Sequence, residues 1–261
     1  MRGIFAEHTI TKEIKIMGIN LDKIKQRKQA LESKGGGNNN FWRPQDGDQS
    51  IRIVPTADGD PFKDYFFHYN LGKNPGFLCP KKNFGDGCPV CEYASSLYNQ
   101  GTEDAQKAAK TLFARQRFFS PVLVRGEEAD GVRVWGYGKM AYESLINLVL
   151  NPEYGDITDA EEGTDLVLNY GKPPGAQFPQ TKLQPRRRSS PLCDDGPEKC
   201  AELLDNIPEF DDLFERKTTE EIGTLLDAFL EGGDEEGTET TQYKKADESS
   251  SVDEAFNELL S

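Results

Sequence analysis

Residues 68–91 read HYNLGKNPGFLCPKKNFGDGCPVC and place one histidine and three cysteines in a single short stretch. The spacing is His68-x10-Cys79-x8-Cys88-x2-Cys91. Three thiolates and one imidazole are a donor set that suits tetrahedral Zn²⁺. The two-residue gap between Cys88 and Cys91 lets one tight turn direct both sulfurs to the same point. Because four protein ligands fill the coordination sphere, the pattern predicts one structural zinc ion rather than a catalytic one.

Two alternatives to a metal site stay open for this cluster: buried core residues without a metal, or disulfide-bonded cysteines. The chain has five cysteines, an odd number, and nothing at its start resembles a secretory signal, which disfavours a disulfide framework. We therefore expect a reducing cytoplasm, where thiolates remain available to a metal. The chain has only two histidines, so His68 is the natural fourth ligand.

Charge is segregated along the chain. Residues 1–193 hold 26 Lys and Arg against 23 Asp and Glu, whereas residues 194–261 hold 5 against 22. The first part also contains 21 of the 26 aromatic residues. This distribution predicts a polyanion-binding body with a competing acidic end, although a protein with a merely solvated acidic tail would have the same composition. No apolar run approaches the roughly 20 residues that a membrane-spanning helix needs.

The residues before the body divide into two parts. Residues 1–16 fit poorly with the chain after Met17, and we interpret them as a leader that is non-native or disordered. Residues 17–40 form a basic arm, in which an amphipathic helix over 19–34 precedes a Gly and Asn linker. An interaction role is predicted for this arm, and a solvated helix without a function is the alternative. Its positive side chains include Lys23, Lys25, Arg27 and Lys28.

Alternating and helical patterns predict a mixed body over residues 41–231. Strands are expected at 50–54, 65–69, 115–125, 132–137, 165–170 and 177–187, and helices at 92–100, 104–113, 140–150 and within 194–231. The fold class predicted is α+β: an OB-like five-stranded β-barrel with an inserted zinc subdomain at about 65–114, C-terminal helices and flexible arms. A β-sandwich would give a similar pattern of strands.

The final segment, 232–261, is acidic. Its polar part, 234–250, is predicted to be disordered. Apolar residues then recur between acidic ones, as expected of a docking peptide that folds on a partner: Val252, Phe256, Leu259 and Leu260.

Three stretches of the body interleave cations with aromatic rings. Single-stranded nucleic acid binds to positive grooves in which bases stack on such rings, each stacked base contributing about 1–3 kcal/mol. Trp135 and Tyr137 fall on the same face of a strand and could serve one base track, unless either ring belongs to the core. The candidate nucleic-acid contacts in these stretches are Arg115, Arg117, Phe118, Trp135, Tyr137, Lys139, Phe178, Arg186, Arg187 and Arg188.

Signs of catalysis are sparse. The chain has no P-loop motif, and its two histidines are too few for a histidine-based nuclease. We therefore expect no enzyme. A zinc-containing adapter that binds replication or transcription proteins without nucleic acid is the main alternative, and a metal-dependent nuclease would need an open metal site.

The metal stretch resembles a known family. His68, Cys79 and the run Cys88-Pro-Val-Cys91-Glu-Tyr, followed by Leu97-Tyr98-Asn99, are similar to the zinc segment of the single-stranded DNA-binding (helix-destabilising) protein of T-even-like tailed bacteriophages. Looser similarity extends over roughly residues 19–261. The gaps between ligands are somewhat shorter here than in that family.

This resemblance implies a non-enzymatic protein of phage DNA replication, recombination and repair, acting in the cytoplasm of an infected bacterium. It implies a DNA cleft between an OB-like body and the zinc subdomain. Lys25, Arg27 and Lys28 resemble a basic motif for cooperative self-association along DNA, and the acidic tail resembles a segment that contacts replication and recombination proteins and covers the cleft. Cleft positions are matched by Tyr98, Arg115, Phe118, Trp135 and Phe178.

Overall fold

The computed structural model describes residues 40–72, 74–176, 178–193, 196–232, 255–256 and 259–260. The chain divides into two units, Met1–Gly37 and Asn38–Ser261, and every described residue belongs to the second. The predicted leader, nearly all of the basic arm and the stretch 234–250 lie outside the described residues. None of the described helices is long and apolar enough to cross a membrane.

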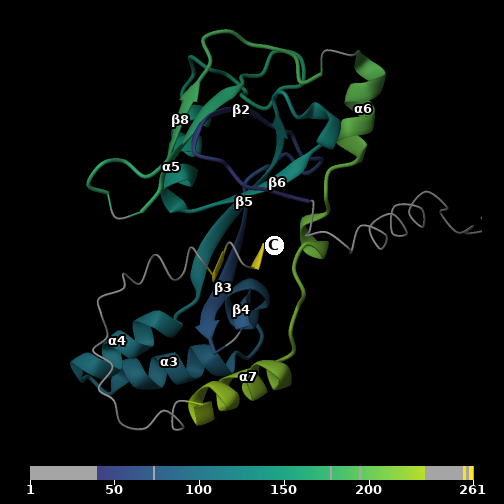
Figure 1. The fold of residues 1–261 in the computed structure, drawn as a ribbon. Coiled ribbons are helices and arrows are strands. Elements are labelled where there is room, and N and C mark those ends of the chain that lie inside the picture. The colour runs from purple at the N-terminus through teal and green to yellow at the C-terminus, as the bar shows by residue number, and fades with distance from the viewer. Residues whose placement is uncertain are drawn as a thin grey trace, which may run out of the picture. The chain divides into compact units, whose positions relative to one another are not determined.

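One sheet of eight strands organises the described part of the second unit (Figure 1). Strand β5 is its longest member and joins its two halves. One edge of β5 pairs with β6 from Phe118 to Val122, and the other edge pairs with β3 and then with β2. Strand β1 runs parallel to β6, and the other pairs are antiparallel. The strands are β1 Phe41–Trp42, β2 Gly47–Ile53, β3 Lys63–Leu71, β4 Asn74–Leu78, β5 Arg115–Val124, β6 Arg133–Tyr137, β7 Leu166–Gly171 and β8 Gln180–Pro185.

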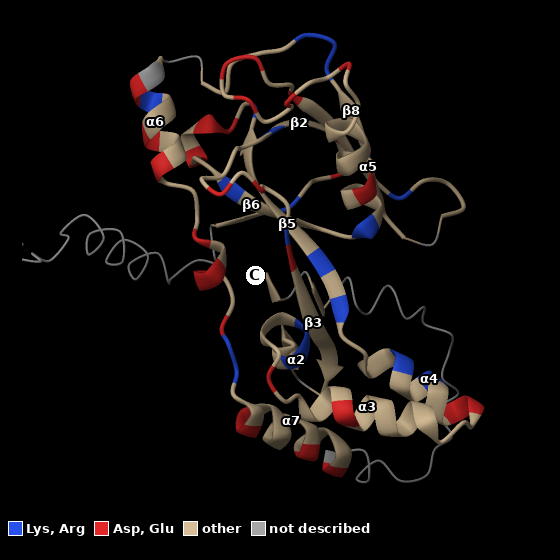
Figure 2. Cartoon of the chain, turned by 180° about the vertical axis from the view of Figure 1, so that it is seen from behind, with Lys and Arg blue, Asp and Glu red and all other residues tan. Residues whose placement is uncertain are grey.

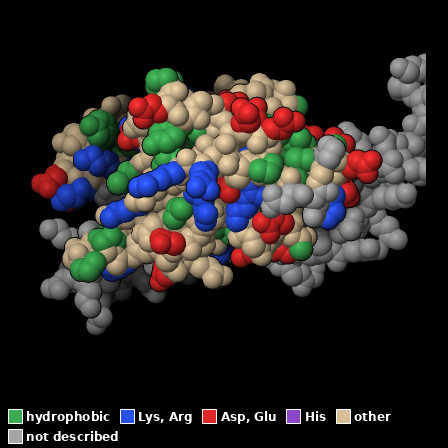
Figure 3. All heavy atoms as spheres, turned by 90° about the horizontal axis from the view of Figure 1, so that it is seen from above, with side chains coloured by type: hydrophobic (Ala, Val, Ile, Leu, Met, Phe, Trp, Pro, Cys, Tyr) green, Lys and Arg blue, Asp and Glu red, His purple; other side chains and the backbone are tan. Residues whose placement is uncertain are grey.

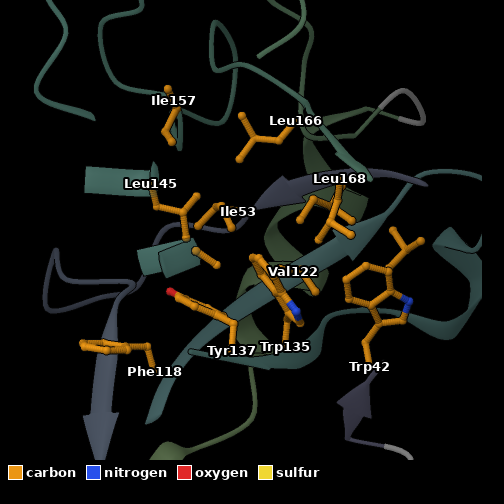
Figure 4. Packing of buried hydrophobic residues seen from close by; sticks show 13 residues of the cluster. Trp42, Ile53, Phe118, Val122, Trp135, Tyr137, Leu145, Ile157, Leu166 and Leu168 are labelled. Carbon is orange, nitrogen blue, oxygen red and sulfur yellow. The ribbon is translucent and has the colours of Figure 1, made fainter. Parts of the chain in front are cut away.

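The sequence Phe118-Phe119 on β5 sends two rings to opposite faces of the sheet, because side chains alternate along a strand. Phe118 joins the main core, where Trp42, Trp135 and Tyr137 pack among aliphatic side chains of β2, β5 and β7 (Figure 4). Phe119 joins a second cluster on the other face, with Phe67 and Val134. We call this second surface the tail face; its buried sheet residues are Phe67, Tyr69, Leu78, Phe119 and Val134.

The α+β prediction is confirmed, but the strand count differs. The described residues form eight strands, whereas six were expected along the chain and five of them in a barrel. OB-type closure stays a prediction. Strand β1 has only two residues, too few for a visible alternation. Strand β4 (Asn74–Leu78) lies between two metal ligands in a run with proline and glycine, which favours a loop by composition.

Helices gather around the metal-ligand stretch. Helices α2 (Pro80–Phe84), α3 (Pro89–Asn99) and α4 (Glu103–Leu112) come after the β3–β4 hairpin in the chain. Helix α7 (Thr219–Gly232) packs on α3 and adds Ile222 and Leu226 to the same apolar core. The core beside the metal ligands is therefore completed by a helix more than 100 residues away in sequence.

The remaining helices cover the main part of the sheet. Helix α5 (Lys139–Val149) packs against β8 and β5, with Leu145 fully buried. Helix α6 (Pro197–Asp205) brings Leu203 and Leu204 to a small cluster around Leu123. Two short 3₁₀ turns occupy Glu128–Asp130 and Phe210–Asp212.

A buried ionic network ties distant loops to the sheet. The fully buried Arg52 donates from Nε to Asp165 at 2.8 Å and from Nη1 to the Asp159 carbonyl at 3.0 Å. Arg125 donates to both carboxylate oxygens of Asp165, at 3.0 Å each. Both arginines also donate to backbone carbonyls in the segment 190–192. Each buried charge thus has a partner, which removes most of the cost of placing it in the interior.

The two cysteines outside the metal-ligand cluster form a disulfide. Cys193 and Cys200 are bonded across a Cα–Cα distance of 5.5 Å. This pair was not predicted from the sequence, and it runs against the expectation of a reducing cytoplasm, where disulfides are rare.

Candidate metal centre and nucleic-acid interface

The four predicted metal ligands converge from three elements. His68 lies on β3, opposite Phe77 of β4, and Cys79 comes directly after β4 and caps α2. Cys88 caps α3, and Cys91 lies in the first turn of that helix. Proline at the first position of each helix starts it immediately after its cysteine, because the ring fixes φ and needs no hydrogen bond there.

The ligand atoms are close enough to share one ion. All four side chains are buried, and their ligand atoms lie within 4.8 Å of one another. The sulfur atoms of Cys79 and Cys91 are 3.5 Å apart, and His68 Nε2 lies 3.3 Å from Cys88 Sγ and 3.4 Å from Cys91 Sγ. The edges of a tetrahedral zinc site are about 3.3–3.8 Å, given metal–ligand distances of about 2.0–2.3 Å. The residues therefore fit one tetrahedral cation.

Supporting contacts orient these ligands. His68 Nδ1 lies 2.8 Å from the Leu112 carbonyl, so Nδ1 carries the proton and Nε2 keeps its lone pair for a metal. The Lys82 backbone N–H points at Cys79 Sγ at 3.4 Å. Helix α4 thus positions the histidine through the Leu112 carbonyl and supplies none of the four candidate ligands.

The pKa values of His68, Cys79 and Cys91 shift in different directions, because several ionisable groups share one buried space. Burial works against protonated His68, but contacts with the thiols of Cys79 and Cys88 outweigh it and raise the pKa of His68 to about 9. Hydrogen bonds from Cys88 and Cys91 lower the pKa of Cys79, while contacts with Cys79 and Cys88 raise the pKa of Cys91. Buried thiols that cannot all ionise by themselves can do so around a divalent ion.

A group of the predicted DNA contacts lies around the start of β5. Arg115 and Arg117 are half-buried there, and Arg115 Nη2 donates to the Lys110 carbonyl of α4 at 3.0 Å. A Cβ placed on Gly138 would lie 3.2 Å from Arg117 Nη1, so Arg117 reaches the start of α5, where Lys139 is exposed. Figure 2 shows cations on the part of β5 that leads from the upper half of the sheet toward α4, and further cations on α4 itself.

Tyr98, at the end of α3, presents an open ring near this junction. It is 43% exposed, and its ring centroid lies 6.0 Å from that of Phe113, two residues before Arg115. An exposed aromatic ring is a surface on which an unpaired base can stack.

Three other predicted stacking rings belong to the core, which corrects the expectation of open platforms. Trp135 is 1% exposed and Tyr137 4%, and their ring centroids are 4.2 Å apart. Phe118 is 4% exposed and stacks on Tyr142 at 3.9 Å. The two β6 rings do share a face, as the strand period requires, but that face is the buried one (Figure 4).

Tyr142 is a ring that the helical pattern predicts to point inward. It is half-buried and lines a cavity of about 350 Å³ with Glu143, Ile146 and Asn147. Helical periodicity could not predict this cavity. The period shows on which side of the helix a side chain lies, but it does not show which other residues lie there.

The remaining DNA candidates are spread over the β7–β8 part of the sheet. Phe178 is half-buried in the loop before β8. Arg186, Arg187 and Arg188 come after β8 and are exposed. Seen from above the view of Figure 1, Lys and Arg side chains form a band over the surface (Figure 3).

The predicted docking residues of the C-terminus pack on the tail face. Phe256 and Leu260 are buried and Leu259 is half-buried. Val252 lies outside the described residues, as do Lys25, Arg27 and Lys28 of the basic arm. The receiving surface was not identified from the sequence; its only signal there is the dense aromatic run Tyr65-Phe66-Phe67-His68-Tyr69.

The basic start of β5 and the buried Cys₃His cluster, which could hold one metal ion, together favour a nucleic-acid-binding protein. A family model described as gp32 DNA binding protein like matches residues 45–231. The chain belongs to this family of DNA-binding proteins, which confirms the resemblance drawn from the metal stretch. A search of curated proteins found no match.

Proposed function

We propose that the protein binds single-stranded DNA without sequence preference and coats strands during phage DNA replication, recombination and repair, in the cytoplasm of an infected bacterial cell. The observation that carries this proposal is the family match over residues 45–231. The protein acts passively, because a strand whose bases are stacked on protein cannot re-pair.

The junction at the start of β5 supports the proposal. Arg115 and Arg117, with Lys139 and Lys110 nearby, supply positive charge for phosphates, and Tyr98 supplies an open ring. Phosphate contacts release counterions and are independent of sequence, and stacking accepts any base. Phe178 and Arg186–Arg188 extend the proposed contact surface.

One zinc ion is the proposed occupant of the cluster formed by His68, Cys79, Cys88 and Cys91. Zinc favours a tetrahedral set of three thiolates and one imidazole, and the four ligands leave no position for a reacting water. Its role is structural: it fixes β3, β4, α2 and α3 together, and α4 leads from them into β5.

Two arms complete the proposal. Lys25, Arg27 and Lys28 of arm 17–40 mediate cooperative self-association along DNA. The acidic tail 232–261 contacts replication and recombination proteins and competes electrostatically with DNA. Deleting residues 233–261 is therefore expected to raise DNA affinity, most strongly at low salt.

Fluorescence anisotropy with labelled oligo(dT), and with a duplex of equal length, tests the proposal over a range of salt concentrations. We expect tighter binding to the single strand, with log K falling by about 0.7 for each phosphate contact per unit of log salt. Binding to labelled RNA of the same length tests whether the protein prefers DNA to RNA. Absence of binding to either DNA at low salt would contradict the proposal. It would favour the alternative of a zinc-containing adapter that binds proteins and no nucleic acid.

A further inference from the structure

Cys193 and Cys200 form a disulfide whose two ends are held by the fold in different ways. On the Cys193 side, the preceding Leu192 is fully buried, and its N–H donates to the Ala160 carbonyl at 2.8 Å. Arg125 donates to the Leu192 carbonyl at 2.9 Å. This end of the disulfide is therefore fixed to the buried ionic network of the sheet.

Cys200 lies in the first turn of α6, a helix that packs through half-buried side chains. Its N–H donates to the Gly196 carbonyl at 3.3 Å, at the beginning of the helix. No side chain of α6 that the structure describes is buried. Leu203 and Leu204 are half-buried against the cluster around Leu123. Because half-buried side chains gain only part of the free energy of burial, the disulfide adds an attachment that packing alone does not supply.

The pair meets the conditions for reversible thiol chemistry. Its Cα atoms are 5.5 Å apart, within the usual range for disulfides, so the bond can form without a movement of the backbone. Both cysteines of the pair are half-buried and can be reached by a small reagent, whereas Cys79, Cys88 and Cys91 are buried. Disulfides of reducing compartments are usually transient, with catalytic or redox-sensing roles. In the proposed cytoplasmic setting, this pair is therefore expected to open and close rather than to remain a permanent link.

We propose that Cys193 and Cys200 are a reversible redox pair that exchanges with a low-molecular-weight disulfide such as oxidised glutathione. One protein thiolate attacks the glutathione disulfide, which forms a mixed disulfide and releases one glutathione thiolate. The second protein thiolate then attacks the protein sulfur of the mixed disulfide, so that the Cys193–Cys200 bond forms and the second glutathione thiolate leaves. Two protein thiols are thereby oxidised, one glutathione disulfide is reduced, and the two protons end on the glutathione thiols.

Oxidation of the pair anchors the start of the segment that leads from α6 to the metal-ligand core (Figure 1). After α6, Ile207 packs on the cluster around Leu123, and Phe210 and Phe214 pack on the tail face. Helix α7 then contributes to the core beside the metal ligands. The redox state of the pair therefore sets how firmly α6, the beginning of this segment, is held to the sheet. This inference goes beyond the proposed function, since it does not depend on DNA binding.

Thiol labelling of the full-length, zinc-loaded chain tests the exchange. The chain is equilibrated in buffers with a series of ratios of reduced to oxidised glutathione, and free thiols are trapped with N-ethylmaleimide and located by mass spectrometry. We expect Cys193 and Cys200 to lose their labelling together, in one reversible transition within the glutathione ratios of a cytoplasm. Three outcomes would overturn the proposal: a pair still oxidised in the most reducing buffer, a pair still reduced in the most oxidising one, or a cysteine that retains glutathione without forming the bridge.

Hydrogen exchange of the oxidised and the reduced chain tests the anchoring of α6. We expect amide exchange in α6 to be about ten- to hundredfold faster in the reduced chain, the range that closing a short loop confers, while exchange in α3 stays unchanged. The matched variant, Cys200→Ser, cannot close the bridge and should exchange like the reduced chain in both buffers. Equal exchange in α6 of the oxidised and reduced wild-type chain overturns the inference, whether or not the variant folds. Because neither measurement uses DNA, such a result leaves the proposed function intact, and failure to bind oligo(dT) leaves this inference intact.

Discussion

The metal centre and the tail face are both built around β3, yet they are assembled in opposite ways. The four metal ligands fall within 24 residues, and two of them lie on one turn. The tail face combines β1, β3, β4, β5, β6, segment 210–214 and the C-terminus, which span residues 41–260. A local site is visible in the sequence as a spacing, whereas a site made by long-range contacts exists only after folding. Four predictions test this contrast, from the largest expected effect to the smallest.

Loss of one metal ligand is expected to have the largest effect. In Cys91→Ser a hydroxyl replaces a thiolate, so we expect the metal to be lost and the helices around it to melt. Structural zinc contributes about 10–16 kcal/mol in small zinc domains, although here the apolar core with α7 retains part of the stability. Metal analysis and circular dichroism melting measure the outcome.

Cys200→Ser is the matched control, because it breaks the Cys193–Cys200 disulfide and leaves the cluster intact. It should keep its metal. If Cys91→Ser also retains wild-type metal content and melting temperature, the cluster is not a structural metal site.

The buried Arg52–Asp165 network tests whether contacts between distant segments stabilise the fold as well as the local metal-ligand cluster does. Asp165→Asn removes the carboxylate that both Arg52 and Arg125 contact and leaves buried positive charge without a counterion. We expect a loss of about 3–5 kcal/mol in the free energy of unfolding, measured by urea denaturation.

The control is Glu103→Gln, which breaks the exposed pair with Lys107 on α4. Its expected cost is below about 0.5 kcal/mol. Equal midpoints and slopes for the two variants would mean that the network adds nothing to stability.

Arg115 tests the first half of β5, which pairs with β3, the strand that both regions share. Arg115→Ala should lower oligo(dT) affinity about three- to tenfold and reduce the salt slope by about 0.7, because one phosphate contact is lost. Arg133→Ala is the control, since that arginine pairs with Glu127 and Asp130 away from the junction. Anisotropy titrations at several salt concentrations measure both. Identical slopes for Arg115→Ala and wild type would remove Arg115 from the DNA surface.

Tyr65, on the tail face, is expected to show the smallest effect. Burial, and then Asp211, raise the pKa of Tyr65 from 10.0 to about 12. Between these values the unfolded chain loses the phenolic proton while the folded chain keeps it, so the free energy of unfolding falls as pH rises from 10 to 12. Tyr65→Phe should show a smaller fall over that range in urea midpoints. An unchanged pH dependence in Tyr65→Phe would exclude this residue as its source.

The grouping of His68, Cys79, Cys88 and Cys91 into one buried cluster could be predicted from the sequence. Short separations between ligands restrict the chain to few geometries, so the residue types and the Cys88–Cys91 gap suffice. The contribution of α7 to the surrounding core could not be predicted, because amphipathic spacing of Ile222 and Leu226 shows that a helix has an apolar face but does not show which surface that face meets.

The aromatic rings show where local patterns stop being predictive. The two-residue period correctly places Trp135 and Tyr137 on one face of β6. It does not show whether that face is buried or exposed. Packing against β2, β7 and α5 makes that face the interior. The neighbouring Gly136 faces the other way, where it leaves room for Phe256.

The sequence by itself determined a mixed α and β body, a Cys₃His cluster, a segregated charge distribution and an apolar stripe in an acidic end. Each of these is a property of nearby residues or of composition. Tertiary structure decided which rings are core, which strand edge carries Arg115 and Arg117, and where Phe256 rests. Those outcomes depend on which distant segments cover each face of the sheet, and local patterns carry no information about that choice.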